Sequence, residues 1–509
     1  MGTAYLLGID VGTSGCKTVL IDPEGKILAA HTVEYPLYMP EPGWTEQDPE
    51  DWWQAAVAGI RKALADSGVA AERIAGIGLS GQMHGMVPLD SKGQVVRRAI
   101  LWNDQRSAAQ CREMTELAGG LDSLLELTNN QMLPGYTGSK IFWLREQEPQ
   151  NMTKTRMVLN PKDYLRYRLT GDYVTEVSDA SGTGLFDVRE RRWSQTLLDR
   201  LGFAASLLPH CVESTDVTGS VSESAAALTG LKAGTAVVGG GGDAIVQTTG
   251  MGIIKPGVLG ITIGTSGVAA MALEDFKPNI GGRLQVFCNN APRLWHAMGV
   301  TLAAGGSLQW YRDQLCEAEI AKAEAAGTRV YKILDDQAEA ALPGSRNLLF
   351  LPYLIGERCP YADPDAKGAF IGLTLHHGKK EMTRSVMEGV QFSLHQVFDL
   401  FTQLDSEITA DRIIMSGGGS RSQIWRQICA DIFQANVQTI SGSGEGGAFG
   451  AALLAGVGVG LTGSLTDTID RLSIESETEP NHANRAVYEN LYEVYKSLYP
   501  LLADSFKRL

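Results

Sequence analysis

Short apolar, β-branched runs alternate with turns at the start of the chain. Residues 5–9 predict a strand, and residues 18–21 predict a second one. The turn at residues 22–25 contains Pro and Gly and leads into a third strand at residues 26–29. The sequence Gly-Thr-Ser-Gly at residues 12–15 therefore caps a β-hairpin.

This hairpin turn differs from the common nucleotide-binding loops. A P-loop requires GxxxxGK[ST] followed by a helix, whereas Gly15-Cys16-Lys17-Thr18 has one extra residue before the lysine and leads into a strand. A Rossmann dehydrogenase would also place a helix after its GxGxxG turn. We therefore expect backbone N–H groups of a hairpin turn, in which glycine tolerates positive φ, to hold phosphate.

Helical periodicity begins at the sequence Asp48-Pro49-Glu50-Asp51. An aspartate N-cap, a proline at the first helical position and acids in the first turn predict a helix, which stops near Ser67-Gly68. Residues 73–80 predict a buried strand. Residues 236–238 predict another, which runs into four glycines and Asp243.

The pattern begins again near residue 250. Residues 260–267 repeat an apolar strand followed by Gly-Thr-Ser-Gly, which suggests a duplicated fold. Later elements are a strand at 412–415, a glycine turn at 416–420, a helix at 423–433, and a last helix with small residues at 446–452. Alanine- and charge-rich residues 317–342 predict solvated helices. We expect two α/β domains, residues 1–250 and 251–509, with nucleotide bound in the cleft between them.

Composition narrows the class of protein. The chain has 509 residues, 44% hydrophobic and 20% charged, which is typical of a globular protein with more than one domain. The formal charge of −14 and the absence of a basic stripe argue against a nucleic-acid partner. Seven scattered cysteines without CxxC pairs are typical of reduced thiols, and no apolar run approaches ~20 residues. We expect a cytoplasmic protein without a membrane partner.

Two aspartates at strand ends are candidates for phosphoryl-transfer chemistry. Asp10 either caps its own loop or holds Mg²⁺ beside nucleotide phosphates. Asp243 is either a helix N-cap or a base that accepts a hydroxyl proton, and the four preceding glycines would let a substrate approach closely. Together they form the pair that phosphoryl transfer uses, with one acid for the metal and one for the proton. Lys17 either contacts a phosphate or is a solvated lysine.

Two further strand ends carry groups suited to a small polar ligand. The first, Ser80-Gly81-Gln82-Met83-His84-Gly85, places a histidine between glycines, where it is either packed or part of a binding pocket. The second, Leu101-Trp102-Asn103-Asp104, combines an aromatic wall with hydrogen-bonding groups, a mixture that holds sugars. The pair His376-His377 lies in a glycine-containing turn without acidic partners, and we expect it at the surface.

Several longer stretches resemble the FGGY family of carbohydrate kinases. Residues 135–147, Gly-Tyr-Thr-Gly-Ser-Lys-Ile-Phe-Trp-Leu-Arg-Glu-Gln, fit the first family signature, and residues 368–388 fit the second. The sequence Gly-Gln-Met-His-Gly at 81–85 resembles the sugar-contact motif of the family branch that acts on D-xylulose. Residues 161–165 and 178–183 are also similar to that branch. The resemblance covers the chain to about residue 495.

The resemblance implies two actin-like (ribonuclease H-like) domains, a homodimer, and ATP and Mg²⁺ as cofactors. It implies that Asp243 is the catalytic base, with Asp10 and Asp243 on the metal side. It implies that Met83 and His84, in the motif that also contains Gln82, contact the sugar. The other candidate sugar-contacting residues are Asp243 and, from the second strand end described above, Trp102, Asn103 and Asp104. The implied nucleotide-binding residues are Gly12, Thr13, Ser14, Lys17, Gly264, Thr265, Ser266, Gly305, Gln309, Gly418, Gly419 and Ser420.

The implied activity is ATP-dependent phosphorylation of the terminal hydroxyl of a ketopentose, first of all D-xylulose. One position departs from that branch: Ala244 follows the catalytic aspartate where asparagine is usual, and alanine cannot make the amide's hydrogen bond to the sugar. Cys359 and Tyr361 also replace the common Thr and His. The alternatives are therefore another sugar or polyol, namely L-xylulose, ribulose, gluconate or glycerol. An actin-like ATPase without kinase activity is the alternative from another class.

Overall fold

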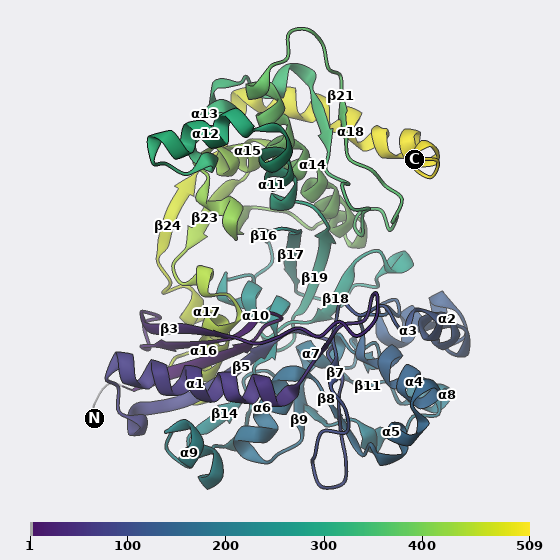
Figure 1. Ribbon diagram of the computed structural model, residues 1–509, viewed down its shortest axis with the longest axis vertical. Helices are drawn as coiled ribbons and strands as arrows, with labels where there is room; N and C mark the ends of the chain where they lie inside the picture. Colours follow the sequence, from purple (N-terminus) through teal and green to yellow (C-terminus); the bar gives the residue numbers. More distant parts are fainter. Residues whose placement is uncertain (1–3) are drawn as a thin grey trace.

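The computed structural model describes residues 4–509 and divides into two lobes, each built on a mixed sheet (Figure 1). The first sheet has the strand order β13–β14–β5–β1–β2–β3, with β15 beside β5. Its strands are β1 (Tyr5–Val11), β2 (Gly15–Ile21), β3 (Ile27–Glu34), β5 (Ile74–Gly81), β13 (Val217–Ser220), β14 (Ala236–Val238) and β15 (Gly241–Gly242).

The second sheet repeats the core pairings of the first. Its order is β18–β19–β17–β16–β22–β23–β24. β16 pairs antiparallel with β17 and parallel with β22, as β1 pairs with β2 and β5. The predicted duplicated α/β architecture is therefore confirmed. The strands are β16 (Val258–Ile263), β17 (Gly267–Leu273), β18 (Gln285–Cys288), β19 (Trp295–Thr301), β22 (Arg412–Ser416), β23 (Asn436–Ile440) and β24 (Ile474–Thr478).

Helices and two-stranded pairs complete the first lobe. Its helices are α1 (Pro49–Ser67), α2 (Ala108–Leu117), α3 (Leu121–Thr128), α4 (Thr137–Gln147), α5 (Pro149–Lys154), α6 (Pro161–Thr170), α7 (Val177–Ser181), α8 (Gln195–Leu201), α9 (Glu223–Thr229) and α10 (Asp243–Gly250). The paired short strands are β4 (Glu46–Gln47) with β7 (Ala99–Ile100), β6 (Val87–Leu89) with β8 (Met157–Leu159), β9 (Val174–Glu176) with β12 (His210–Val212), and β10 (Phe186–Asp187) with β11 (Arg192–Trp193).

In the second lobe, a long helix passes through the core. α14 (Lys379–Leu404) buries most of its length against the sheet and the flanking helices. The other helices of this lobe are α11 (Gly305–Leu315), α12 (Glu317–Ala326), α13 (Val330–Ala340), α15 (Gln423–Phe433) and α18 (Arg485–Phe506), and β20 (Leu349–Leu351) pairs with β21 (Ala369–Ile371). Two more helices of the second half of the chain, α16 (Gly447–Gly458) and α17 (Leu465–Ile469), pack on the first lobe.

Local sequence signals define the ends of α1. The Asp48 side chain accepts a hydrogen bond from the Glu50 N–H, Pro49 occupies the first turn, and Gly68 ends the helix in the left-handed conformation. The predicted helix is confirmed at both ends. The helix at 423–433 is confirmed with the same bounds.

Helix α16 comes from the second half of the chain but covers the first sheet, as Figure 1 shows. It lies against β1 and β5, and close approach requires glycine there: a Cβ on Gly78 would lie 1.8 Å from the Ala451 carbonyl oxygen. Our expectation that this helix is the last was wrong, because α17 and α18 follow it. α18 packs on the second lobe through residues such as Tyr488 and Tyr495.

The hairpin of β18 and β19 belongs to the second sheet but docks on the first lobe. Phe287 and Met298 share a hydrophobic cluster with Met83 and Tyr136 of the first lobe. Cys288 packs beside helix α7. Within residues 4–509, no helix is both long and apolar enough to cross a bilayer.

Candidate active site

Parallel strand ends bring Asp10 and Asp243 to one edge of the first sheet. Asp10 lies opposite Ser80 of β5, and Ser80 lies opposite Gly241 of β15. Two strand spacings separate residues 10 and 241, about 10 Å, and Asp243 follows as the first residue of α10. Because Asp10 contributes to the raised pKa of Asp243, the two carboxyl groups interact electrostatically.

The Asp10 carboxyl group is partly buried and closely packed. Burial raises its pKa, while the nearby Ser80 hydroxyl and the charge of Lys17 oppose that rise. Its Oδ1 atom is buried without a hydrogen-bond partner in the described part of the chain. Gly447, at the start of α16, is so close that a Cβ there would lie 3.0 Å from Asp10 Oδ1.

Asp243 carries the most strongly perturbed carboxyl group of this edge. Burial, and secondly the charge of Asp10, raise its pKa to about 7. Hydrogen bonds from the backbone of Ala244 and Met83 lower the pKa and partly offset this rise. The Ala244 N–H lies 2.8 Å from Asp243 Oδ1. Gly242 is the N-cap residue of α10, so Asp243 is not the N-cap. A carboxyl group with a pKa near neutrality suits general base catalysis.

The two carboxylates fit a magnesium ion better than a metal that needs several protein ligands. Within residues 4–509, no group of three or more His, Cys, Asp and Glu side chains is arranged to hold a metal ion. Mg²⁺ typically takes one or two carboxylates and completes its shell with water and substrate phosphate oxygens. The partnerless Asp10 Oδ1 is such a ligand atom.

The four glycines before Asp243 do not open a path for substrate, contrary to our expectation. A Cβ on Gly239 would lie 2.5 Å from the Glu213 carbonyl oxygen, and one on Gly240 would lie 1.9 Å from that of Leu79. A Cβ on Gly242 would lie 2.6 Å from Met83 Cγ. The glycines are required because protein atoms already fill the space around the loop.

The first Gly-Thr-Ser turn is braced from behind by Gln82. Gln82 is buried and its amide donates to the Gly12 carbonyl and to Gln47 Oε1, at 3.3 and 2.8 Å. Thr13 Oγ1 in turn donates to Gln82 Oε1 at 3.4 Å. Gln82, which lies in the sugar-contact motif, thus has its amide engaged with the turn. Ser14 is the exposed residue of this turn.

Lys17 lies opposite Asp10 on β2 and forms an ion pair across to the start of α16. Its Nζ lies 3.1 Å from Glu445 Oε2, and both side chains are about one-third exposed, at 30% and 32%. If Lys17 contacts a phosphate, its ammonium group must either break the ion pair with Glu445 or bind both anions at once.

Met83 and His84 form a wall near Asp243. His84 adopts a positive φ of 71°, and its Nδ1 lies 2.6 Å from the Gly182 carbonyl oxygen. Residue 182 must be glycine, because a Cβ there would lie 2.5 Å from the His84 ring. Since a carbonyl only accepts, Nδ1 carries the proton. Burial is the main cause of a pKa lowered to about 3, so the ring is neutral and its Nε2 offers a lone pair. The ring packs against Tyr136 with 4.6 Å between the centroids and the two planes tilted by 36°.

The Trp102-Asn103-Asp104 segment divides into an exposed and a buried part. Trp102 is 43% exposed, and its Nε1 donates to Thr13 Oγ1 at 3.0 Å, so its indole lies at the first Gly-Thr-Ser turn. Asn103 Oδ1 accepts from Thr45 Oγ1 at 2.7 Å. Asp104 is fully buried and forms an ion pair with Arg106 at 2.8 Å, which engages its carboxylate inside the protein.

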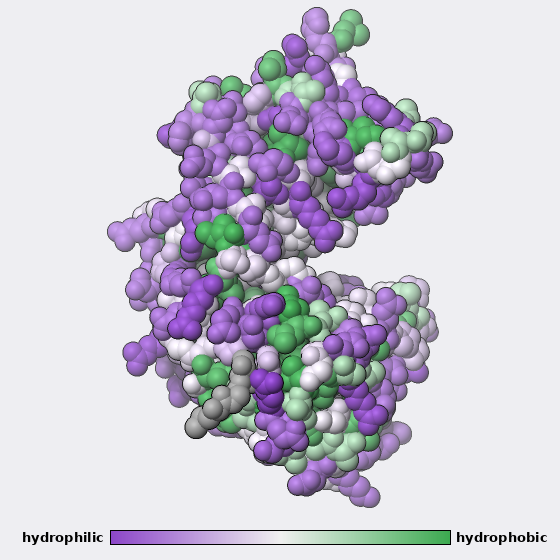
Figure 2. Space-filling model, turned by 90° about the vertical axis from the view of Figure 1, so that its left-hand side faces the viewer, coloured by the Kyte–Doolittle hydropathy of each residue, from purple (hydrophilic) through white to green (hydrophobic). Residues whose placement is uncertain are grey.

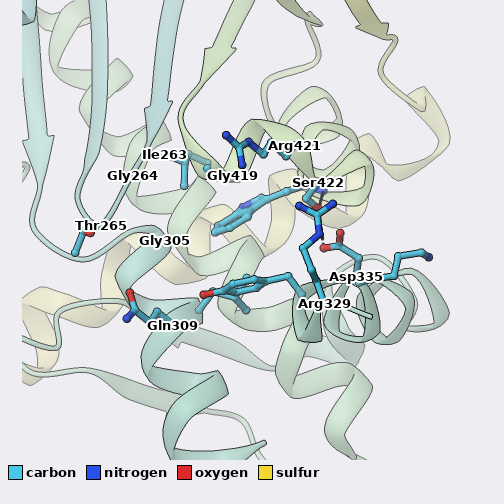
Figure 3. A pocket seen from close by; sticks show the side chains of 15 residues that line it. Ile263, Gly264, Thr265, Gly305, Gln309, Arg329, Asp335, Gly419, Arg421 and Ser422 are labelled. Atoms are coloured by element: carbon cyan, nitrogen blue, oxygen red, sulfur yellow. Dashed lines mark hydrogen bonds between the residues drawn. The ribbon is translucent and has the colours of Figure 1, made fainter. Parts of the chain in front are cut away.

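A cavity of about 480 Å³ opens in the second lobe at the ends of β16 and β22 (Figure 3). Of the residues assigned to nucleotide, it is lined by Gly264, Thr265, Gly305, Gln309, Gly418 and Gly419. Ser266 and Ser420 are not among the lining residues. The Ser420 hydroxyl donates instead to the Gly417 carbonyl at 2.9 Å.

The sequence pattern missed half of this cavity. Arg329, Tyr331, Lys332 and Asp335, at the start of α13, form its other wall, and Figure 3 shows Arg329 and Asp335 facing Ser422. Asp335 Oδ1 accepts from Ser422 Oγ at 2.8 Å. Residues 317–342 form the predicted helices with most side chains exposed or half-buried, and the start of α13 in addition lines this cavity. The only sequence signal for a binding role of α13 was the mixture of charged residues with Tyr331 at the start of the helix.

The second Gly-Thr-Ser turn is fixed by the start of α11. The N–H groups of Gly305 and Gly306 donate to the carbonyls of Gly264 and Thr265, at 2.8 and 3.0 Å. A Cβ on Gly305 would lie 2.4 Å from the Gly264 carbonyl oxygen, so glycine is required for this close packing. The turn lies on one side of the cavity, with Gln309 beside it (Figure 3).

A deep notch separates the two lobes in the space-filling view (Figure 2). The first lobe therefore offers one sheet edge with two carboxylates and a neutral histidine, and the second lobe offers a cavity lined by glycine-rich turns. Carboxylates together with glycine-rich turns that can bind phosphate are the elements of a phosphotransferase that uses an alcohol as acceptor.

Comparison with known proteins agrees with this geometry. The model of the FGGY family of carbohydrate kinases, N-terminal domain, matches residues 5–250, and that of the C-terminal domain matches residues 259–459. The chain belongs to the FGGY family of carbohydrate kinases and is thus a sugar kinase.

Individual relatives are similar over nearly the full length. The chain is 39% identical to xylulose kinase of Bacillus subtilis, covering 98% of this chain and 97% of that protein. It is 31% identical to gluconokinase of the same organism, covering 100% and 98%. The crystal structure of ligand-bound xylulose kinase from Lactobacillus acidophilus matches with a TM-score of 0.90 at 28% identity, covering 99% of each chain.

Proposed function

We propose that this sugar kinase transfers the γ-phosphoryl group of ATP to the terminal hydroxyl of D-xylulose, giving D-xylulose 5-phosphate. The observation that carries the proposal is Asp243, a carboxyl group with a pKa of about 7 beside the Met83-His84 wall. Similarity to xylulose kinases over nearly the whole chain supports D-xylulose as the acceptor.

In the proposed reaction, Asp243 acts as the general base. Its carboxylate accepts the proton of the sugar's terminal hydroxyl as that oxygen attacks the γ-phosphorus, and the bond from phosphorus to the ADP oxygen breaks. The His84 Nε2 lone pair accepts a hydrogen bond from another sugar hydroxyl, while Met83 packs on the carbon chain. Trp102 forms the wall of the proposed sugar site next to the turn at Thr13.

Asp10 and Asp243 would hold Mg²⁺ through oxygen atoms and water. When bound there, the ion supplies positive charge that offsets the negative charge of the transferring phosphoryl group. The turn at Gly12, Thr13 and Ser14 would contact the phosphates from the first lobe. The turn at 264–266, with Gly305 and Gln309, would contact them from the second lobe.

The nucleoside would occupy the cavity of the second lobe. The Gly418-Gly419 turn forms one wall and the start of α13 the other, so an adenine ring would lie between them. The proposal also includes a homodimer, which the family resemblance supports. It includes a cytoplasmic location, which the seven free cysteines, most of them buried, support.

A sugar acid is the second candidate acceptor, because Ala244 lacks the amide expected of a xylulose site and a gluconokinase is among the relatives. The test is ADP release with a panel of D-xylulose, L-xylulose, ribulose, gluconate and glycerol, with a sugar-free control. The proposal requires the highest kcat/KM with D-xylulose. A higher kcat/KM with gluconate would overturn it.

A further inference from the structure

The loop that precedes Asp243 is held by a buried hydroxyl. Ser178 Oγ, on α7, accepts hydrogen bonds from the Gly242 N–H and from Asn290 Nδ2, each at 3.1 Å. The same hydroxyl donates to Glu176 Oε1 at 2.8 Å. Since a serine hydroxyl has one donor and two acceptor positions, all of its hydrogen-bonding capacity is used within the protein.

Glu176 anchors this hydroxyl from behind. Besides Ser178 Oγ, its carboxylate accepts from the N–H groups of Ser178 and Asp179, both at 2.8 Å, and from Ser214 Oγ at 2.7 Å. Lys162 Nζ lies 3.7 Å away, and both charged side chains are fully buried. A buried charge with this many partners is expensive to disturb, so Ser178 is attached to a rigid support.

Asn290 brings the second lobe into the same network. It lies in the turn between β18 and β19, is fully buried, and also donates to Ser214 Oγ at 2.9 Å. Its Oδ1 accepts from Thr249 Oγ1 at 2.8 Å, on the helix that starts at Asp243. A Cβ on Gly241 would lie 2.4 Å from Asn290 Nδ2. Asn290 therefore contacts both the loop before Asp243 and the helix after it.

We propose that Ser178 and Asn290 are positioning residues for Asp243. Through Asn290, the placement of the base depends on docking of the β18–β19 hairpin, which belongs to the sheet of the nucleotide lobe. The hydrogen bonds of both side chains go to protein atoms, so neither acts on the sugar itself. This inference rests on the proposed role of Asp243 as the base.

The first test is Ser178→Ala, which leaves the Gly242 N–H without its partner. A base displaced by about 1 Å costs on the order of 10–100-fold in rate, so kcat should fall by that factor. The KM for D-xylulose, and its affinity measured by tryptophan fluorescence, should change by less than about twofold, because the sugar wall is untouched.

Ser222→Ala is the matched control. Ser222 is the N-cap of α9, where its hydroxyl accepts from the Ala225 N–H at 3.2 Å, outside this network. The same hydroxyl group is removed from a serine that accepts a backbone N–H, so the control measures the effect of losing such a hydrogen bond away from Asp243. Its kcat should stay within about twofold of the parent. A kcat of Ser178→Ala equal to that of Ser222→Ala would overturn the inference.

The second test joins Asn290→Ala with Ser178→Ala. Because both residues act through one loop, the double variant should lose about as much kcat as the worse single variant. Losses that multiply would contradict a shared network. If Ser178→Ala does not fold, Asn290→Ala alone must show the same fall in kcat at constant KM, or the inference fails.

Asp243→Asn, measured beside them, separates the two proposals. If Asp243→Asn loses turnover while Ser178→Ala keeps it, only the positioning role is refuted. If Asp243→Asn keeps near-normal turnover, the proposed base itself is refuted.

Discussion

At the scale of single residues, the raised pKa of Asp243 sets the pH range in which the protein can act. The base works only when ionised, and its pKa is raised to about 7 by burial and by Asp10. We therefore expect kcat/KM to fall tenfold per pH unit below about pH 7 and to level off above it.

A variant of the neighbouring carboxylate tests the cause of this pH dependence. Asp10→Asn removes a negative charge near Asp243, so the pKa of Asp243 should fall and the acidic limb of the profile should move to lower pH. Activity measured from pH 5 to pH 9 checks both statements. A limb at the same pH in both proteins would contradict electrostatic coupling of the two residues.

Ala244 is the residue at which substrate choice can be tested. Ala244→Asn introduces an amide beside the base, and one hydrogen bond to a sugar hydroxyl contributes roughly 0.5–1.5 kcal/mol. We expect kcat/KM for D-xylulose to rise about 2–10-fold, and that for gluconate to rise less. An unchanged ratio between the two sugars would show that position 244 does not face the sugar.

The sequence predicted the candidate residues at strand ends, such as Asp10 and Asp243, because parallel strands deliver their carboxyl ends to one edge. It could not predict which neighbours point inward. Gln82 and Asp104 lie in the same motifs as His84 and Trp102, but their side chains are engaged by the protein. Only tertiary contacts distinguish the two groups.

At the scale of elements, helix α16 depends on glycines in the strands beneath it. A Cβ at Gly78 would lie 1.8 Å from the Ala451 carbonyl, so Gly78→Ala should force the helix outward and lower the free energy of unfolding by about 2–4 kcal/mol. Gly444→Ala, where nothing lies within 4 Å, is the matched control. Urea unfolding of both variants measures the difference, and equal midpoints would contradict this account of the packing.

Elements with strong end signals were predictable, and elements whose partners lie far along the chain were not. Capping residues defined α1, and apolar periodicity defined α15. Composition predicted exposed helices at residues 317–342. It could not predict that the start of α13 lines the cavity, because the sequence does not show what a polar helix face contacts. The turn at Asn290 gave no sequence signal, since its role depends on docking of a hairpin onto the other lobe.

At the scale of the whole molecule, Figure 2 shows a deep notch between the two lobes, and the cavity belongs to one lobe and the two carboxylates to the other. Phosphoryl transfer needs the reacting atoms about 3–3.5 Å apart, so the lobes must approach each other when substrates bind. D-xylulose with a non-hydrolysable ATP analogue should reduce the radius of gyration measured by small-angle X-ray scattering, and by more than either ligand alone. An unchanged radius would contradict closure.

The central claim is that Asp243 removes the proton from the sugar hydroxyl. The most direct measurement is the rate of D-xylulose-dependent ADP release by the parent protein and by Asp243→Asn, with nucleotide affinity measured in parallel. We predict that the variant binds ATP normally and loses about 10²–10⁴-fold in kcat. A variant that turns over D-xylulose within tenfold of the parent rate would contradict the claim.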